Sequence, residues 1–176
     1  MRFFPKILTG VLLLAGLFSP AISSEAITVS ELRSISKLTP ETFASFFSDF
    51  EFKFHDDVQN HDTFLASKSG DCDDYATLAA DILKRNGYTP RLIAVRMKGE
   101  THVVCYIMET KSYLDYNFRK DEKKTIPCSG AIKDIARKVS ESFGRDWIAT
   151  YQFTFSEGVK RLVQSIITNR SVEKTI

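Results

Sequence analysis

The sequence lacks several features, and some of these absences exclude a class of protein or a kind of site. Its 176 residues include three cysteines, five prolines and eight glycines. There is no block of like charge, so nothing in the chain supports binding to nucleic acid. There is also no CxxC or HxxxH spacing, which argues against a metal site built from Cys72, Asp73 and a histidine. No repeat, low-complexity tract or Pro/Gly-rich linker divides the chain after residue 23, so we expect one domain.

A short apolar run stands at the N-terminus. Residues 7–18 are apolar, follow two basic residues and precede a small-residue stretch that ends at Ser23. This order is typical of a secretory signal peptide, and a dozen residues are fewer than the roughly 20 that a spanning helix needs. We therefore expect a signal peptide over 1–23, a single domain over 24–176 and a periplasmic or secreted protein with no stable membrane insertion after cleavage.

The mature chain is expected to be near neutral and to carry an odd number of thiols. Cleavage after Ser23 leaves 153 residues with 22 basic and 22 acidic side chains. Export places the chain in an oxidising compartment, where cysteines tend to pair. Three cysteines leave at least one thiol over. Cys105 and Cys128 could form a bridge, which would leave Cys72 free.

The hydrophobic periodicity changes along the chain from a helical to a strand repeat. Helices that come first and adjacent antiparallel strands that follow them indicate an α+β fold. The expected helices cover residues 40–50, 72–86 and 131–143 and a final segment after the capping residue Ser156, and the expected strands cover residues 90–97, 102–108, 112–117 and 147–155.

Cys72 stands among carboxylates at the start of the strongest helical pattern, in the stretch SGDCDDYATLAADILKRNG. A sulfur in the first turn of a helix lies beside unpaired backbone N–H groups and the positive end of the helix dipole, which favours a thiolate. Asp71 and Asp74 have the spacing of N-cap and N3 residues. We therefore expect their charge to be directed at backbone donors and not at the sulfur.

A thiolate nucleophile needs a general base and a third group that orients the base. His102 begins the strand HVVCYI, and Asp115 lies in the next strand, YLDYN. A turn at 109–110 pairs residues whose numbers sum to 219, which places His102 and Asp115 on one face, offset by two positions. Cys105 falls on the opposite face. The sequence therefore predicts the catalytic residues Cys72, His102 and Asp115.

These motifs resemble the core of the transglutaminase-like superfamily, most closely its bacterial periplasmic branch of cysteine proteinases. The resemblance covers residues 54–117, in the order GDCDDYA, LAADILKRNGYTPRLIAV, HVVCYI and YLDYN. It implies a papain-like fold in which a central helix carrying the cysteine packs on an antiparallel sheet. It also implies that Cys72 is the nucleophile, His102 the general base and acid, and Asp115 the residue that orients the imidazole.

The chain departs from that branch just before the Gly-Asp-Cys motif. Members usually have a tryptophan and a proline there, whereas this chain has Phe64 as the aromatic residue and no proline. The donor to an oxyanion is therefore not identified by the resemblance. The backbone N–H of Cys72 and the side chains of Gln59 or Asn60 are the candidates.

Some relatives in the branch bind calcium through acids beside the cysteine. Asp71 and Asp73 match those positions, but two carboxylates fall short of the six to eight oxygens that calcium takes. We therefore expect no required cofactor and leave calcium open.

The expected function is a cysteine hydrolase that acts on peptide or glutamine amides through a thioester. Hydrolysis is favoured over crosslinking because an exported enzyme is surrounded by water, while deamidation stays open. The expected partner is a protein or peptide substrate, and the oligomeric state is not indicated. The alternative is a non-catalytic module on the same fold that binds a peptide or cell-wall fragment, which would need none of the three catalytic residues.

Overall fold

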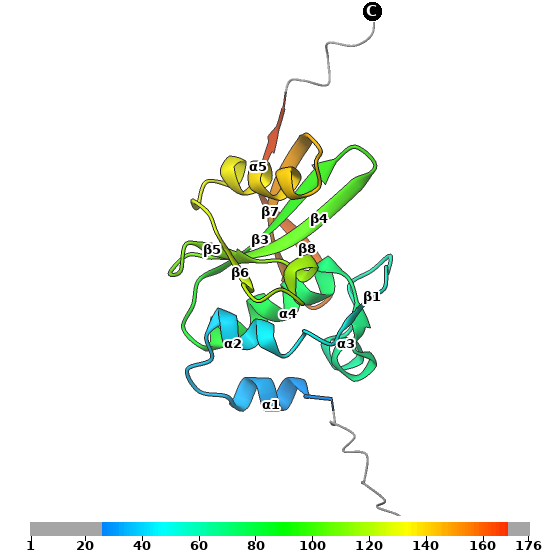
Figure 1. Ribbon diagram of the computed structural model, residues 1–176, viewed down its shortest axis with the longest axis vertical. Coiled ribbons are helices and arrows are strands. Elements are labelled where there is room, and N and C mark those ends of the chain that lie inside the picture. Colours follow the sequence, from blue (N-terminus) through cyan, green and yellow to red (C-terminus); the bar gives the residue numbers. More distant parts are fainter. Residues whose placement is uncertain (1–25, 169–176) are drawn as a thin grey trace, which may run out of the picture.

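The computed structural model describes residues 26–168. Six strands form an antiparallel sheet in the order β6-β5-β4-β3-β7-β8, and β1 and β2 form a small parallel pair. In Figure 1, α1 to α4 lie together on one side of the sheet and α5 on the other. In chain order the elements are α1 (Val29–Ser34), α2 (Pro40–Ser45), β1 (Glu51–Phe52), α3 (His61–Ser67), β2 (Ser69–Gly70), α4 (Cys72–Arg85), β3 (Pro90–Met97), β4 (Glu100–Ile107), β5 (Ser112–Leu114), the 3-10 turn η1 (Tyr116–Phe118), β6 (Thr125–Pro127), α5 (Ile132–Ser142), β7 (Trp147–Ser156) and β8 (Val159–Ile167).

The central helix α4 carries Cys72 and packs on strands β3 and β4. It begins with the expected capping box of Asp71 and Asp74 and ends before Gly87, whose φ of +87° suits a residue without a Cβ. On its buried side, Tyr75 packs against aromatic residues of the preceding segment, among them Phe43 and Phe47. The predicted α+β fold, with a cysteine-bearing helix on an antiparallel sheet, is confirmed.

The predicted register between β4 and β5 is also confirmed. Cys105 pairs with Leu114 and Ile107 with Ser112, so paired numbers sum to 219. The strands end earlier than expected, and residues 108–111 form the turn. The register holds because a longer turn centred on the same two residues keeps the same pairs opposite each other.

The sheet separates two hydrophobic clusters. One lies under α1 to α4 and includes Cys105, and the other lies under α5 and has Cys128 packed against it. All three cysteines are free. The bridge considered between Cys105 and Cys128 is therefore not formed, because the two thiols belong to cores on opposite faces of the sheet.

The final helix predicted after Ser156 is wrong, because Val159–Ile167 is strand β8. Ser156 pairs with Val159 across a two-residue turn in which Glu157 and Gly158 both have positive φ, 52° and 75°. Two such residues make a tight hairpin turn whose twist suits the flanking strands. The apolar residues of this segment fit a helical face by spacing, but the hairpin and pairing with β7 decide its conformation. The residues concerned are Val159, Leu162, Val163, Ile166 and Ile167.

The predicted signal peptide over 1–23 lies outside the described residues. Within residues 26–168, no helix has the length and apolar character needed to cross a membrane.

Candidate active site

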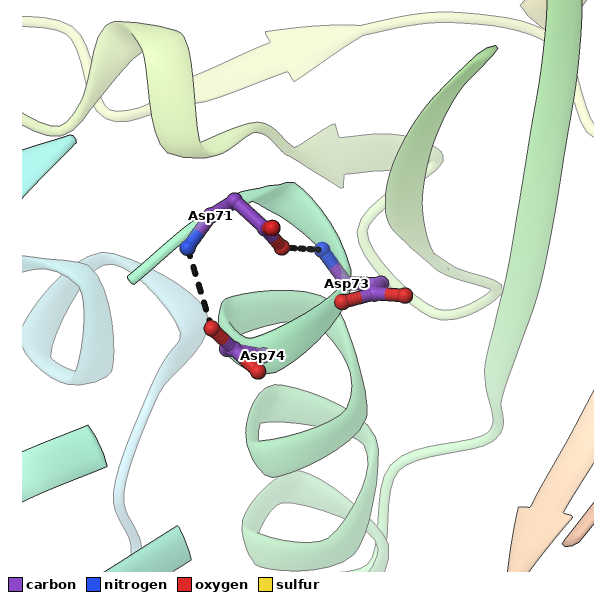
Figure 2. Close-up of side chains that lie close together, drawn as sticks. All are labelled: Asp71, Asp73 and Asp74. Atoms are coloured by element: carbon purple, nitrogen blue, oxygen red, sulfur yellow. Dashed lines mark hydrogen bonds between the residues drawn. The ribbon is translucent and has the colours of Figure 1, made fainter. Parts of the chain in front are cut away.

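The entrance of α4 is built from hydrogen bonds between carboxylates and backbone N–H groups. Figure 2 shows two of these bonds: the N–H of Asp71 donates to Asp74 Oδ2 at 3.0 Å, and the N–H of Asp73 donates to Asp71 Oδ1 at 3.2 Å. The Gln59 backbone N–H donates to Asp74 Oδ1 at 2.6 Å, and Gln59 Nε2 donates to Oδ2 at 2.7 Å. Asp74 is therefore a buried structural cap, and Cys72 is held in the first turn of the helix.

Gly70 of the Gly-Asp-Cys motif is required for space. A Cβ on Gly70 would lie 2.5 Å from Asp74 Oδ2 and 2.6 Å from Cδ2 of the buried Phe64 ring. No real Cβ makes contacts that short. The glycine lets the chain pass between the aromatic ring and the helix cap just before Cys72.

His102 and Asp115 meet where β4 begins and β5 has ended. His102 Nε2 and Asp115 Oδ1 are 2.8 Å apart, and both side chains are buried. Asp115 Oδ1 also accepts the backbone N–H of Asn117 at 2.9 Å, which fixes the carboxylate. Because Asp115 takes Nε2, Nδ1 is the ring nitrogen left for a second partner.

The surroundings favour the charged form of His102. Burial opposes the charge, but the charge and hydrogen bond of Asp115, together with the nearby Cys72 side chain, outweigh burial and raise the pKa of His102 to about 10. The imidazole ring also packs against the ring of Phe143, with centroids 4.9 Å apart. The structure thus brings Cys72, His102 and Asp115 together.

The site opens into a cleft of about 800 Å³ between the entrance of α4, the start of β4 and strand β8. Cys72 and His102 line the cleft, whereas Asp115 lies behind His102 and does not. A substrate in the cleft would therefore meet the sulfur and the imidazole but not the carboxylate. The other lining residues are Phe52, Phe54, His55, Asp56, Asp71, Asp73, Ala94, Gly99, Glu100, Thr101, Val103, Asn117, Tyr151, Phe153, Lys160 and Leu162.

Two cleft residues had no signal in the sequence. Lys160 of β8 donates to Asp73 Oδ2 at 2.7 Å, across 87 positions of the chain. His55, in the loop after β1, donates its backbone N–H to Asp71 Oδ2 at 2.9 Å and lines the cleft. Both contacts join segments far apart in sequence, and local periodicity contains no information about them.

The two side chains considered as donors to an oxyanion, Gln59 and Asn60, lie outside the cleft. Gln59 Nε2 donates to Asp74 and to the Ser69 carbonyl oxygen, and Asn60 accepts the N–H of Asp62 as the cap of α3. Neither residue lines the cleft. The backbone N–H of Cys72, in the first turn of α4, is the candidate that remains.

Asp71, Asp73 and Asp74 could hold a metal ion, since one oxygen of each lies within 4.8 Å of the others. Both oxygens of Asp74 already accept N–H donors. Asp73 Oδ1 is buried and has no hydrogen-bond partner among the described residues. Burial and the neighbouring carboxyl side chain of Asp73 raise the pKa of Asp71 to about 6. Asp71 likewise accepts N–H donors at both oxygens, from Asp73 and His55, and Asp73 Oδ2 accepts Lys160 Nζ, so the orphaned Asp73 Oδ1 is the open acceptor that this cluster offers to a cation.

The comparisons with known proteins concern the family of the chain and its fold. The transglutaminase-like domain family matches residues 28–126, more than half of the chain and a range that includes Cys72, His102 and Asp115. Among solved structures, calcium-bound LapG of Legionella pneumophila is similar with 18% identity and a TM-score of 0.47, over 77% of this chain and 74% of that one. No curated protein matches the sequence.

Proposed function

Because the chain belongs to the transglutaminase-like domain family, we propose that it is a cysteine hydrolase that cleaves peptide or glutamine amides with Cys72, His102 and Asp115. The observation that carries the proposal is the 2.8 Å bond between the buried His102 and Asp115, next to a cysteine at a helix entrance in the same cleft. A binding module would have no use for an oriented, charged imidazole beside a thiol. The arrangement is the one that nucleophilic catalysis requires.

The reaction follows from the positions of the three groups. The Cys72 sulfur, as thiolate, forms a bond to the amide carbon, and the carbonyl oxygen becomes an oxyanion. His102 then gives its Nδ1 proton to the amine nitrogen as the C–N bond breaks, which leaves a thioester and a neutral imidazole. Water attacks the thioester, His102 takes a proton from that water, and the C–S bond breaks to release the acid and restore the thiolate.

Asp115 keeps its negative charge throughout the cycle. Its bond to Nε2 leaves Nδ1 as the nitrogen that exchanges a proton with the reacting groups, and its charge stabilises the imidazolium of the resting state. The Cys72 backbone N–H is positioned in the first turn of α4, where the helix dipole favours an oxyanion.

We place the enzyme in the periplasm or outside the cell. The support is the apolar segment 7–18 with its basic flank and its small-residue end at Ser23. In that location water is the abundant acyl acceptor, which favours hydrolysis over crosslinking.

The decisive experiment compares Cys72→Ala with the native protein. Both are incubated with a mixture of unfolded bacterial proteins, and mass spectrometry records new N-termini and deamidated glutamines. We expect new N-termini with the native protein and a loss of about a thousandfold or more in Cys72→Ala. Cys128→Ala, which removes a thiol on the other side of the sheet, is the control and should cleave like the native protein.

Equal turnover by the native protein and Cys72→Ala would rule out the hydrolase. Deamidated glutamines without new N-termini would show that Cys72, His102 and Asp115 act on the side-chain amide of glutamine and not on the peptide bond.

Calcium is the cation we propose for Asp71 and Asp73, with water or backbone oxygens as the remaining ligands. When bound, it would neutralise the repulsion between two carboxylates at the entrance of α4. We expect 5 mM calcium, about five times the Kd of the weakest protein calcium sites, to raise the thermal unfolding midpoint of the native protein. Asp73→Asn should abolish the rise, whereas Asp56→Asn, another acid of the cleft, should keep it. A midpoint unchanged by calcium would contradict the site.

A further inference from the structure

Most of the large exposed apolar side chains of residues 26–168 lie in the cleft or along β8. Phe54 is 71% exposed, Phe52 57% and Leu162 64%, and all three line the cleft that holds Cys72. Three more follow along β8, which carries Leu162. Large apolar side chains that are exposed together mark a surface that binds a partner. The β8 residues are Val159, Val163 and Ile167, and the remaining exposed one, Met108, lies in the turn after β4.

Strand β8 is an edge of the six-stranded sheet, and its side chains are almost all exposed. An edge strand has backbone N–H and C=O groups that point away from the sheet and can pair with another extended chain. Proteins usually protect such an edge with charge. Here Lys160 and Arg161 stand only at the start of the strand, and Lys160 is engaged with Asp73.

The same strand forms part of the cleft. Lys160 and Leu162 line it, and β8 then runs away from α4 towards the end of the described chain (Figure 1). Leu162 pairs with Phe153, which packs in the core under α4, so Leu162 projects from the same face of the sheet. Phe54, which also lines the cleft, belongs to the loop after β1, far from β8 in sequence.

Building on the hydrolase function, we propose that the substrate is a polypeptide bound in extended conformation as an added strand on β8, with a bulky apolar side chain held by Phe54 and Leu162 next to the scissile amide. An extended chain has backbone groups free to pair with the edge and side chains that alternate between two faces. One of these faces would meet the apolar cleft. The continuity of the edge with the cleft of Cys72 identifies the occupant as substrate, since a second copy paired on β8 would obstruct that cleft.

The first test measures specificity. A library of decapeptides with blocked ends is incubated with the native protein, Leu162→Ser, Phe54→Ser and Met108→Ser, and the products are identified by mass spectrometry. We expect cleavage beside leucine, isoleucine, phenylalanine or methionine. The value of kcat/KM at those sites should fall about tenfold in Leu162→Ser and Phe54→Ser. Met108→Ser, which removes an exposed apolar side chain outside the cleft, should stay within about twofold of the native protein.

The second test measures the strand pairing without catalysis. Fluorescent decapeptides that carry a single N-methyl group at successive positions are titrated with Cys72→Ala, and anisotropy gives the affinity. Pairing with an edge strand predicts that affinity falls at every second position, because only alternate N–H groups face β8. Equal affinity at all positions, or a loss without alternation, would overturn the added strand.

The outcomes separate this inference from the hydrolase function. If no amide is cleaved but Cys72→Ala binds the peptides with the alternating pattern, and Leu162→Ser weakens the binding, the surface is upheld and the hydrolase fails. If cleavage occurs without apolar preference, or if kcat/KM falls as much in Met108→Ser as in Leu162→Ser, the proposed binding surface is wrong and the hydrolase function is upheld. A dimer seen by sedimentation that Leu162→Ser abolishes would assign the edge to a second copy and overturn the inference.

Discussion

At the scale of single residues, the site depends on a charged imidazole kept inside the protein. Burial alone would neutralise His102. The adjacent carboxylate of Asp115 reverses that effect, so the pKa of His102 is raised to about 10 from its ordinary value of 6.5. A proton held this firmly is available to a leaving amine, and the same interaction links stability to pH.

The raised pKa of His102 predicts how the free energy of unfolding depends on pH. A group whose pKa is higher in the folded state stabilises the fold fully below its unfolded pKa of 6.5 and loses that contribution as pH rises towards 10. The free energy of unfolding of the native protein should therefore decline between pH 7 and 10. In Asp115→Asn, the decline should be smaller because the partner charge is gone. Urea unfolding at each pH measures both, and parallel curves would contradict the ion pair.

At the scale of elements, the entrance of α4 is where the sequence pattern and the packing agree. Asp71 and Asp74 cap the helix as their spacing predicts, and Gly70 gives space to Phe64. Most residues of the motif around Cys72 therefore serve to set the residue at which α4 begins. Its position fixes where the sulfur lies relative to His102.

Gly70→Ala tests that reading. The added methyl group meets Phe64 and the Asp74 carboxylate, so the cap or the ring must shift. We expect a loss of about 1–3 kcal/mol in the free energy of unfolding, the usual cost of overpacking. Ser69→Ala, the neighbouring change in β2, should cost less than about 0.5 kcal/mol. Equal stabilities in urea unfolding would show that the entrance of α4 has room to spare.

At the scale of the whole molecule, one sheet separates two cores, and the three thiols are divided among three environments. Cys72 lines the cleft, Cys105 is buried under α4, and Cys128 packs on the α5 side. Burial raises the pKa of both Cys105 and Cys128. An exported chain would therefore carry three thiols even in an oxidising compartment.

Thiol counting checks this arrangement. Protein purified without reductant should give three reactive thiols per chain in denaturant, because none is paired. In the native state iodoacetamide should label Cys72 first, and Cys72→Ala should lose the fast phase alone. A count of one thiol in denaturant would mean that Cys105 and Cys128 do pair, against the two-core arrangement.

The sequence by itself determined the features that depend on near neighbours. The cap and length of α4, the strand at 90–97 and the 219 register follow from local spacing, and the register alone placed His102 and Asp115 on one face. The resemblance to the transglutaminase-like superfamily rested on the same local motifs.

The tertiary structure decided the rest. Whether Val159–Ile167 became a helix or a strand depended on pairing with β7, and the separation of Cys105 from Cys128 depended on which face of the sheet each packs against. The Lys160 contact to Asp73 joins residues 87 positions apart. Such contacts form only when burial of apolar surface brings distant segments together. The part of the cleft that β8 lines therefore exists only in the folded molecule.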